Sequence, residues 1–188
     1  AIFQWSAPQL TSKPGSIGTC RPPADKGSAE LRPDSFMGAG LYLYRYRWAY
    51  GADYREVDGG RARIARVCEW AQRAGVKWTR EEIQWATTEP KEGEFDWRFY
   101  DDVVRIAHEH GISVYGLLCY WSGWAAKDTP EGVEQYCRWV RQVVRHYKDR
   151  IKHWEIWNEP NIFFWTGPRE LYAQMLSKAY AAIKEEDP

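Results

Sequence analysis

The chain lacks an excess of charge of either sign and lacks any long apolar run. Its 26 lysines and arginines balance its 26 aspartates and glutamates, which argues against binding dominated by electrostatic attraction to nucleic acid or to an anionic membrane. No segment approaches the roughly 20 consecutive apolar residues of a membrane-spanning helix. We therefore expect neither nucleic acid nor a membrane as a partner.

Residues that typically hold metals are few and scattered. The four cysteines, Cys20, Cys68, Cys119 and Cys137, lie far apart and form no paired metal-ligand motif, and the four histidines lack the spacing of a zinc site. Cys68 and Cys137 fall on the inward sides of expected helices, so we interpret them as buried free thiols. We expect no metal site and no cofactor.

Four short apolar segments recur at nearly even intervals, and each is followed by a segment of helical character. They are residues 36–43, 76–82, 112–120 and 151–157. The third is nearly continuous in apolar residues, as expected of a parallel strand covered on both faces. Strands that alternate with helices pair in parallel through right-handed crossovers. The pattern predicts an α/β fold built from about four βα units.

Two helix boundaries can be predicted from capping residues. Thr129 is suited to cap a helix that has Pro130 in its first turn and Glu131 near the positive end of its dipole. Asp96 and Gly111 are suited to begin and to end the helix before it.

The length of the repeat suggests an incomplete barrel. An eight-stranded (β/α)8 TIM barrel typically needs about 250 residues, whereas residues 36–188 account for only about four units. We interpret residues 36–188 as the first half of a TIM-barrel catalytic domain. Residues 1–35 contain five prolines and neither helical nor strand periodicity, so we interpret them as a linker or the remnant of a preceding domain.

Tryptophan is abundant, with 12 in 188 residues. Several fall at or after the ends of the expected strands: Trp48, Trp85, Trp121, Trp124 and Trp165. In a parallel βα architecture these positions line one mouth, where active sites lie. Plain hydrophobic packing is the alternative for each of them, and it is the interpretation we give to Trp70, Trp97 and Trp139, which lie in expected helices.

Residues 154–161 read WEIWNEPN and carry the most specific signal in the chain. The pair Asn158 and Glu159 lies where the fourth apolar segment ends, and Pro160 stops the strand because proline cannot donate to a sheet ladder. A carboxyl group at such an edge, flanked by tryptophans that can stack on sugar rings, favours acid chemistry on a sugar. The alternative is that the pair only caps the turn.

Other carboxylates near this motif receive no catalytic role. Strand alternation puts Glu155 on the same face as Glu159 but about 13 Å deeper, where a buried ion pair is the better interpretation. Glu82 lies nearer the mouth, on the strand that carries Arg80.

The motif resembles the fourth-strand signature of clan A glycoside hydrolases, (β/α)8 barrels in which the acid/base glutamate follows an asparagine. Residues 76–80, VKWTR, resemble the second strand of the clan, which ends in an arginine. Trp85 together with residues 89–97, EPKEGEFDW, resembles a loop of family 39 and related families. The resemblance covers roughly residues 36–188 and is nearest to family 39 and to family 5-like enzymes.

The resemblance implies roles for individual residues. Glu159 would be the general acid that protonates the departing oxygen and then the base that activates water. Asn158 would hydrogen-bond the sugar 2-hydroxyl, and Arg80 would keep the nucleophile ionised. The sugar subsite would be lined by Tyr120, Trp121 and Trp85. Trp165 would belong to a leaving-group subsite.

The resemblance also implies that one catalytic group lies elsewhere. The clan supplies the nucleophilic carboxylate from its seventh strand, beyond residue 188, so these residues alone are expected to be inactive. The predicted function is hydrolysis of β-linked oligo- or polysaccharides by a retaining double displacement, as in a β-xylosidase or an endo-acting enzyme. One alternative is a carbohydrate-binding barrel without catalysis. The other is an unrelated α/β protein in which the Asn-Glu pair is structural.

Overall fold

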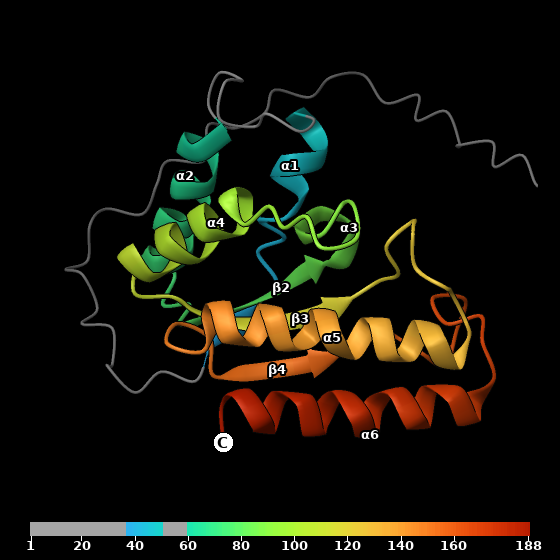
Figure 1. The fold of residues 1–188 in the computed structure, drawn as a ribbon. Helices are drawn as coiled ribbons and strands as arrows, with labels where there is room; N and C mark the ends of the chain where they lie inside the picture. Colours follow the sequence, from blue (N-terminus) through green and yellow to red (C-terminus); the bar gives the residue numbers. More distant parts are fainter. Residues whose placement is uncertain (1–36, 51–59) are drawn as a thin grey trace, which may run out of the picture. The chain divides into compact units, whose positions relative to one another are not determined.

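The computed structural model describes residues 37–50 and 60–188, which form a parallel sheet covered by helices (Figure 1). The strands are β1 (Gly38–Ala39), β2 (Trp78–Gln84), β3 (Ser113–Cys119) and β4 (His153–Ile156). They pair in the order β1-β2-β3-β4, and every neighbouring pair is parallel. The parallel arrangement predicted from the four apolar segments is confirmed. The interpretation of residues 1–35 lies outside the described residues.

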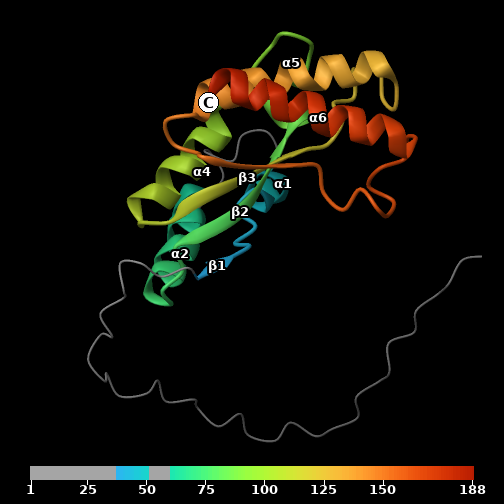
Figure 2. The ribbon, with the colours of Figure 1, turned by 90° about the horizontal axis from the view of Figure 1, so that it is seen from below.

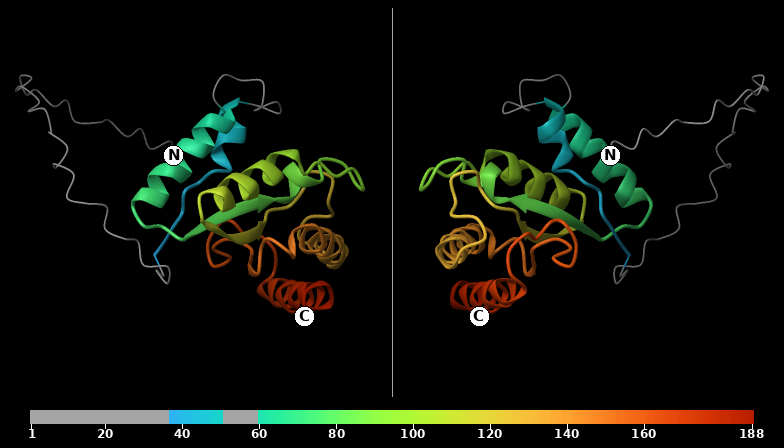
Figure 3. Two further views of the ribbon diagram at one scale, coloured as in Figure 1. Left: turned by 90° about the vertical axis from the view of Figure 1, so that its left-hand side faces the viewer. Right: turned by 90° about the vertical axis from the view of Figure 1, so that its right-hand side faces the viewer.

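Helices connect successive strands and follow the last one. They are α1 (Arg45–Tyr50), α2 (Gly60–Arg73), α3 (Trp85–Thr88), α4 (Arg98–Glu109), α5 (Pro130–Tyr147) and α6 (Arg169–Glu186). The four long helices follow one another in an arc along one side of the sheet (Figure 3). The views agree that α5 and α6 lie side by side (Figures 1 and 2). Within the described part of the chain, no helix is both long enough and apolar enough to cross a membrane.

Of the two helix starts predicted from capping residues, one has the expected side-chain cap. The Thr129 hydroxyl accepts a hydrogen bond from Gly132 N at 3.0 Å, with Pro130 in the first turn, so the predicted start of α5 is confirmed. The start of α4 differs by one residue, because Trp97 occupies the N-cap position without a side-chain cap. The Asp96 carboxylate still accepts from the backbone N–H of Arg98 at 3.1 Å.

The two faces of β2 differ in what covers them. Thr79, Glu81 and Ile83 are buried, whereas Trp78, Arg80 and Glu82 alternate with them and stay partly exposed. Strand register places Tyr115 beside Arg80 and His153 beside Tyr115. We call this partly exposed side the open face and define it by Trp78, Arg80, Tyr115, His153 and Glu155. Of the predicted site residues, the open face carries Arg80.

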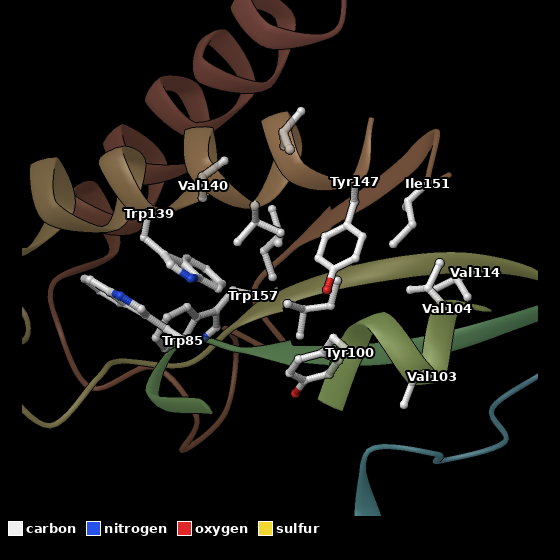
Figure 4. Packing of buried hydrophobic residues seen from close by; sticks show 14 of the residues in the cluster. Trp85, Tyr100, Val103, Val104, Val114, Trp139, Val140, Tyr147, Ile151 and Trp157 are labelled. Carbon is white, nitrogen blue, oxygen red and sulfur yellow. The ribbon is translucent and has the colours of Figure 1, made fainter. Parts of the chain in front are cut away.

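A core of large aromatic and aliphatic side chains fills the space between the sheet and the helices (Figure 4). Trp85 reaches from the end of β2 to Trp139 of α5, and the two rings stack with centroids 5.6 Å apart. Trp139 is buried, as predicted. Trp70 is 59% exposed, so the prediction that it packs inside is wrong: it lies on the outward side of α2.

Candidate functional site

The candidate site lies at the C-terminal edge of the sheet. Because all the strands are parallel, the residues that follow β2, β3 and β4 meet at one edge. Tyr120 follows β3 directly, and Asn158 and Glu159 follow β4 after one intervening residue. Arg80 lies within β2 on the open face and reaches toward this edge.

Arg80 is held by two acceptors from the β4 segment. Its Nε donates to Glu155 Oε2 at 2.7 Å, and its Nη2 donates to Glu155 Oε1 at 2.8 Å. The same Nη2 donates to Asn158 Oδ1 at 2.9 Å. The hydrogen bonds to Glu155 raise the pKa of Arg80 above its ordinary value, so the guanidinium carries its full charge. The expected ion pair of Glu155 forms, with Arg80 as its partner, but the two side chains are 31% and 38% exposed, so the expected burial of the pair is wrong.

The backbone after β4 turns in a way that makes this contact possible. In a strand, residues 155 and 158 point to opposite faces, yet both contact Arg80. Trp157 has φ +66° and Glu159 has φ +41°, a left-handed conformation that is uncommon outside glycine and that concentrates at functional sites. This turn ends the strand alternation and directs the Asn158 amide toward Arg80.

Asn158 connects the arginine to the predicted acid/base residue. Its Nδ2 lies 3.4 Å from Glu159 Oε2, and its side chain also hydrogen-bonds Tyr120. Burial raises the pKa of the Tyr120 hydroxyl, and the hydrogen bond from Asn158 opposes that rise. Glu159 itself is exposed. The structure therefore brings Arg80, Tyr120, Asn158 and Glu159 together.

Two of the predicted sugar-binding tryptophans, Trp85 and Trp165, are buried. Trp85 is 0% exposed, and its Nε1 donates to Glu89 Oε2 at 2.6 Å. A ring without exposed surface cannot stack on a sugar, so the subsite role given to Trp85 is wrong. Trp165 is 7% exposed, and its Nε1 donates to the Pro168 carbonyl at 3.1 Å. Trp165 also lines a cavity of about 450 Å³ in the loop before α6, so its place in a leaving-group subsite stays a prediction.

Tyr120 and Trp121 keep some exposed surface. The Tyr120 ring stacks on Phe164, with centroids 5.4 Å apart and planes at 24°. Trp121 packs against Trp157 and Trp165, at 5.3 Å and 5.7 Å between centroids. The sequence gives no signal for this role of Phe164, which appears there only as one residue of an aromatic run after the motif. The side chain of Trp48 lies outside what the structure describes.

Glu89 holds together the loops that form the mouth of the site, although its own side chain is buried. It is 2% exposed and accepts hydrogen bonds from Trp85 Nε1 and from Gly93 N, the latter at 2.8 Å. Its carbonyl oxygen accepts from Trp124 Nε1 at 3.0 Å, which fastens the loop after β2 to the loop after β3. The Glu-Pro motif at this position was visible in the sequence, but its role is structural.

The described residues offer no metal centre. Across residues 37–50 and 60–188, no group of three or more histidine, cysteine, aspartate or glutamate side chains is arranged to hold a metal ion. Cys68, Cys119 and Cys137 are buried free thiols, which confirms the prediction for Cys68 and Cys137.

Comparison with known sequences gives a family match and several relatives. The family model described as "Glycosyl hydrolase family 10" matches residues 69–177, more than half of the chain. Beta-glucosidase 1B of Phanerodontia chrysosporium is 32% identical over 102 residues, which cover 46% of this chain and 18% of that protein. A beta-1,4-xylanase of Dictyoglomus thermophilum is 26% identical over 119 residues, 57% of this chain and 34% of that protein. The chain thus spans about a third or less of these two relatives.

Solved structures resemble the described fold at lower sequence identity. A family 39 glycoside hydrolase from Bacteroides cellulosilyticus WH2 superposes with a TM-score of 0.57 at 22% identity, covering 70% of this chain and 28% of that one. The exo-beta-1,4-mannosidase Op5Man5 from Opitutaceae bacterium strain TAV5 gives a TM-score of 0.64 at 15% identity, covering 80% of this chain and 30% of that one. At these identities the likeness concerns the fold.

Proposed function

The chain belongs to glycosyl hydrolase family 10, and we propose that it forms the first half of a (β/α)8 barrel that cleaves β-1,4-linked xylan with retention of configuration. The resemblance to clan A glycoside hydrolases is confirmed, and the family model that matches is that of family 10. A relative named as a beta-1,4-xylanase supports xylan as the substrate class.

The observation that carries the proposal is the contact between the Asn-Glu pair and Arg80. Arg80 Nη2 donates to Asn158 Oδ1 at 2.9 Å, and Asn158 Nδ2 lies 3.4 Å from the Glu159 carboxylate. Besides its nucleophilic carboxylate, a retaining glycosidase can use three further groups: an acid/base carboxyl group and a donor for the sugar 2-hydroxyl, and a cation that keeps the nucleophile ionised. Glu159, Asn158 and Arg80 supply these three functions in one connected network.

The proposed reaction has two steps. Glu159 protonates the glycosidic oxygen as the bond to the anomeric carbon breaks, while a second carboxylate attacks that carbon from the opposite side. Glu159, now deprotonated, removes a proton from water, and the water oxygen displaces the carboxylate. Asn158 donates to the 2-hydroxyl, a contact that strengthens as charge develops on the ring.

We place the second carboxylate outside these 188 residues. Glu155 lies on the open face but is bound by Arg80 through both oxygens. Glu82 accepts from Gln84 Nε2 at 2.9 Å, on the strand that carries Arg80. Arg80 Nη1 has no hydrogen-bond partner in residues 37–50 and 60–188, which leaves this donor for the nucleophile.

The open face supports the half-barrel interpretation. Trp78, Arg80, Tyr115 and His153 line a groove of about 420 Å³ there. In a closed barrel, side chains from every strand fill the interior. We propose that further strands cover the open face, and that residues 1–188 alone do not hydrolyse glycosides.

The test uses the complete enzyme with β-1,4-xylan and with β-1,4-glucan as substrates. Release of reducing ends from xylan, with the β-anomer appearing first by ¹H NMR, is the expected result. Preferential cleavage of the glucan would show that β-1,4-glucan, and not xylan, is the substrate. Initial release of the α-anomer would contradict retention. Binding of xylan without cleavage would instead support a carbohydrate-binding barrel that lacks catalysis.

A further inference from the structure

We infer that Glu155 is a positioning residue, which holds Arg80 so that the guanidinium fixes the orientation of the Asn158 amide toward the sugar. This inference rests on the proposed function of the same site. It gives a task to a carboxylate that is neither the acid/base residue nor the nucleophile.

The Glu155 carboxylate fixes the plane of the guanidinium. Both of its oxygens accept from Arg80, one from Nε at 2.7 Å and the other from Nη2 at 2.8 Å. Two parallel hydrogen bonds of this kind define the position and the plane of the guanidinium, whereas a single contact leaves it free to rotate. The Arg80 side chain is 38% exposed, so packing alone does not hold it in one conformation.

The fixed guanidinium determines which end of the Asn158 amide faces it. Arginine has five N–H donors and no acceptor, so the atom of Asn158 that lies 2.9 Å from Arg80 Nη2 must be the oxygen. The amide nitrogen then points away from Arg80, toward Tyr120 and the Glu159 carboxylate. A sugar hydroxyl at the mouth therefore meets an N–H donor from Asn158.

The contrast with another arginine of the chain separates this role from a surface ion pair. Arg141 of α5 makes two hydrogen bonds to the carboxylate of Glu185 of α6, from Nε at 2.9 Å and from Nη2 at 2.7 Å, both accepted by Oε2. The Glu185 side chain is 59% exposed, and the pair is remote in sequence from the Asn-Glu motif. Arg80, in addition, donates a hydrogen bond to Asn158. Substitutions of Glu155 and of Glu185 can therefore be compared as a matched pair.

The experiment compares two substrates of the complete enzyme: an aryl β-xylobioside, and its analogue that lacks the 2-hydroxyl on the sugar next to the aryl group. Glu155→Gln removes the charge and places an amide N–H against the donors of Arg80. We expect kcat/KM to fall at least about 3-fold further on the 2-hydroxyl substrate than on the 2-deoxy analogue, since any effect of Arg80 on the nucleophile is common to the two substrates. Asn158→Ala should show the same selectivity, and combining the two substitutions should add little further loss.

A purely structural role for Glu155 predicts equal losses on the two substrates, in proportion to a lower urea midpoint, and that result would overturn the inference. Glu185→Gln is the matched control and should change neither rate. If Glu155→Gln does not fold, Glu155→Asp keeps the charge but cannot reach both donors, so the same selective loss is expected and an equal loss overturns the inference. If Asn158→Ala lowers kcat/KM equally on the two substrates, the proposed role of Asn158 fails, and the proposed function fails with it. If only Asn158→Ala is selective, the role of Glu155 alone fails.

Discussion

Arg80 and Asn158 are 78 positions apart in the sequence, yet Arg80 Nη2 donates to Asn158 Oδ1 at 2.9 Å. The contact passes from β2 to the turn after β4 and spans the intervening strand β3. It connects an arginine on the open face to the predicted acid/base pair, and the functional predictions below depend on it.

Loss of Arg80 should impair catalysis more than stability. In the complete enzyme, Arg80→Ala would remove the cation that we propose stabilises the nucleophile and would free the Asn158 amide, so kcat/KM should fall at least about 10²-fold. Steady-state kinetics on an aryl β-xylobioside measures this change. Arg141→Ala is the control, because an exposed ion pair contributes less than about 1 kcal/mol to stability and has no role in turnover. Near-wild-type turnover of Arg80→Ala would remove Arg80 from the site.

Trp85 should matter for stability and not for sugar binding. The ring is fully buried, and its Nε1 donates to Glu89. Trp85→Phe keeps an aromatic ring but leaves a buried carboxylate oxygen without that donor, which costs about 1–3 kcal/mol of unfolding free energy. Urea denaturation should reveal the loss, while KM for xylo-oligosaccharides stays within about 2-fold of wild type. A large rise in KM at unchanged stability would restore Trp85 to the subsite.

Glu81 should make stability depend on pH. Burial raises the pKa of Glu81 from 4.5 to about 7 in the folded protein. The folded state therefore binds the proton more tightly, and its contribution to stability is full below pH 4.5 and is lost as the pH rises to about 7. The shift corresponds to a loss of roughly 3 kcal/mol.

Glu81→Gln is the test of this pH dependence. The amide cannot titrate, and it can still accept from Tyr44 N as Glu81 does at 3.3 Å. The urea midpoint of the variant should therefore change less between pH 4.5 and pH 7 than that of the wild type. Parallel midpoints for the two proteins across this range would show that Glu81 does not titrate there.

Gly132 should tolerate no side chain. A Cβ at this position in the first turn of α5 would collide with the Ala126 carbonyl oxygen, a backbone atom. Crowding of this kind typically costs about 1–3 kcal/mol, although alanine recovers up to about 1 kcal/mol of helix propensity. Gly132→Ala should lower the urea midpoint, whereas Gly123→Ala, which meets nothing within 4 Å, should not. Equal midpoints for the two variants would contradict the packing described here.

The order of elements was predictable because each depends on local pattern. Apolar runs gave the four strands, and Thr129 with Pro130 gave the start of α5. The Asn-Glu motif lies just after the end of β4, as its sequence pattern predicted. These features depend on residues close together in the chain, where spacing and capping chemistry decide the outcome.

The details of the site were less predictable because they depend on contacts between distant segments. Strand alternation predicts that Glu155 and Asn158 point to opposite faces, so their shared contact with Arg80 was not expected. The left-handed turn at Trp157 makes this contact possible, and it could not be predicted because the position is not a glycine. Trp85 is buried because Trp139 of α5, which is distant in the sequence, packs against its ring. A tryptophan at the end of a strand is equally compatible with a mouth and with a core.

Glu159 carries the central claim, and Glu159→Gln in the complete enzyme tests it. The substitution removes the proton donor, so hydrolysis of xylan should collapse, because its alkoxide leaving groups need a proton. An aryl glycoside that leaves as a stable phenolate should keep its first step, and the glycosyl-enzyme should accumulate because the base is also missing.

The decisive measurement is the turnover of the aryl β-xylobioside by Glu159→Gln with and without sodium azide, with the product identified by NMR. Azide attacks the glycosyl-enzyme without help from a base, so we predict that turnover is restored and that the product is the β-glycosyl azide. Equal loss on xylan and on the aryl substrate, unchanged by azide and proportional to a loss of stability, would contradict the assignment of Glu159 as the acid/base residue.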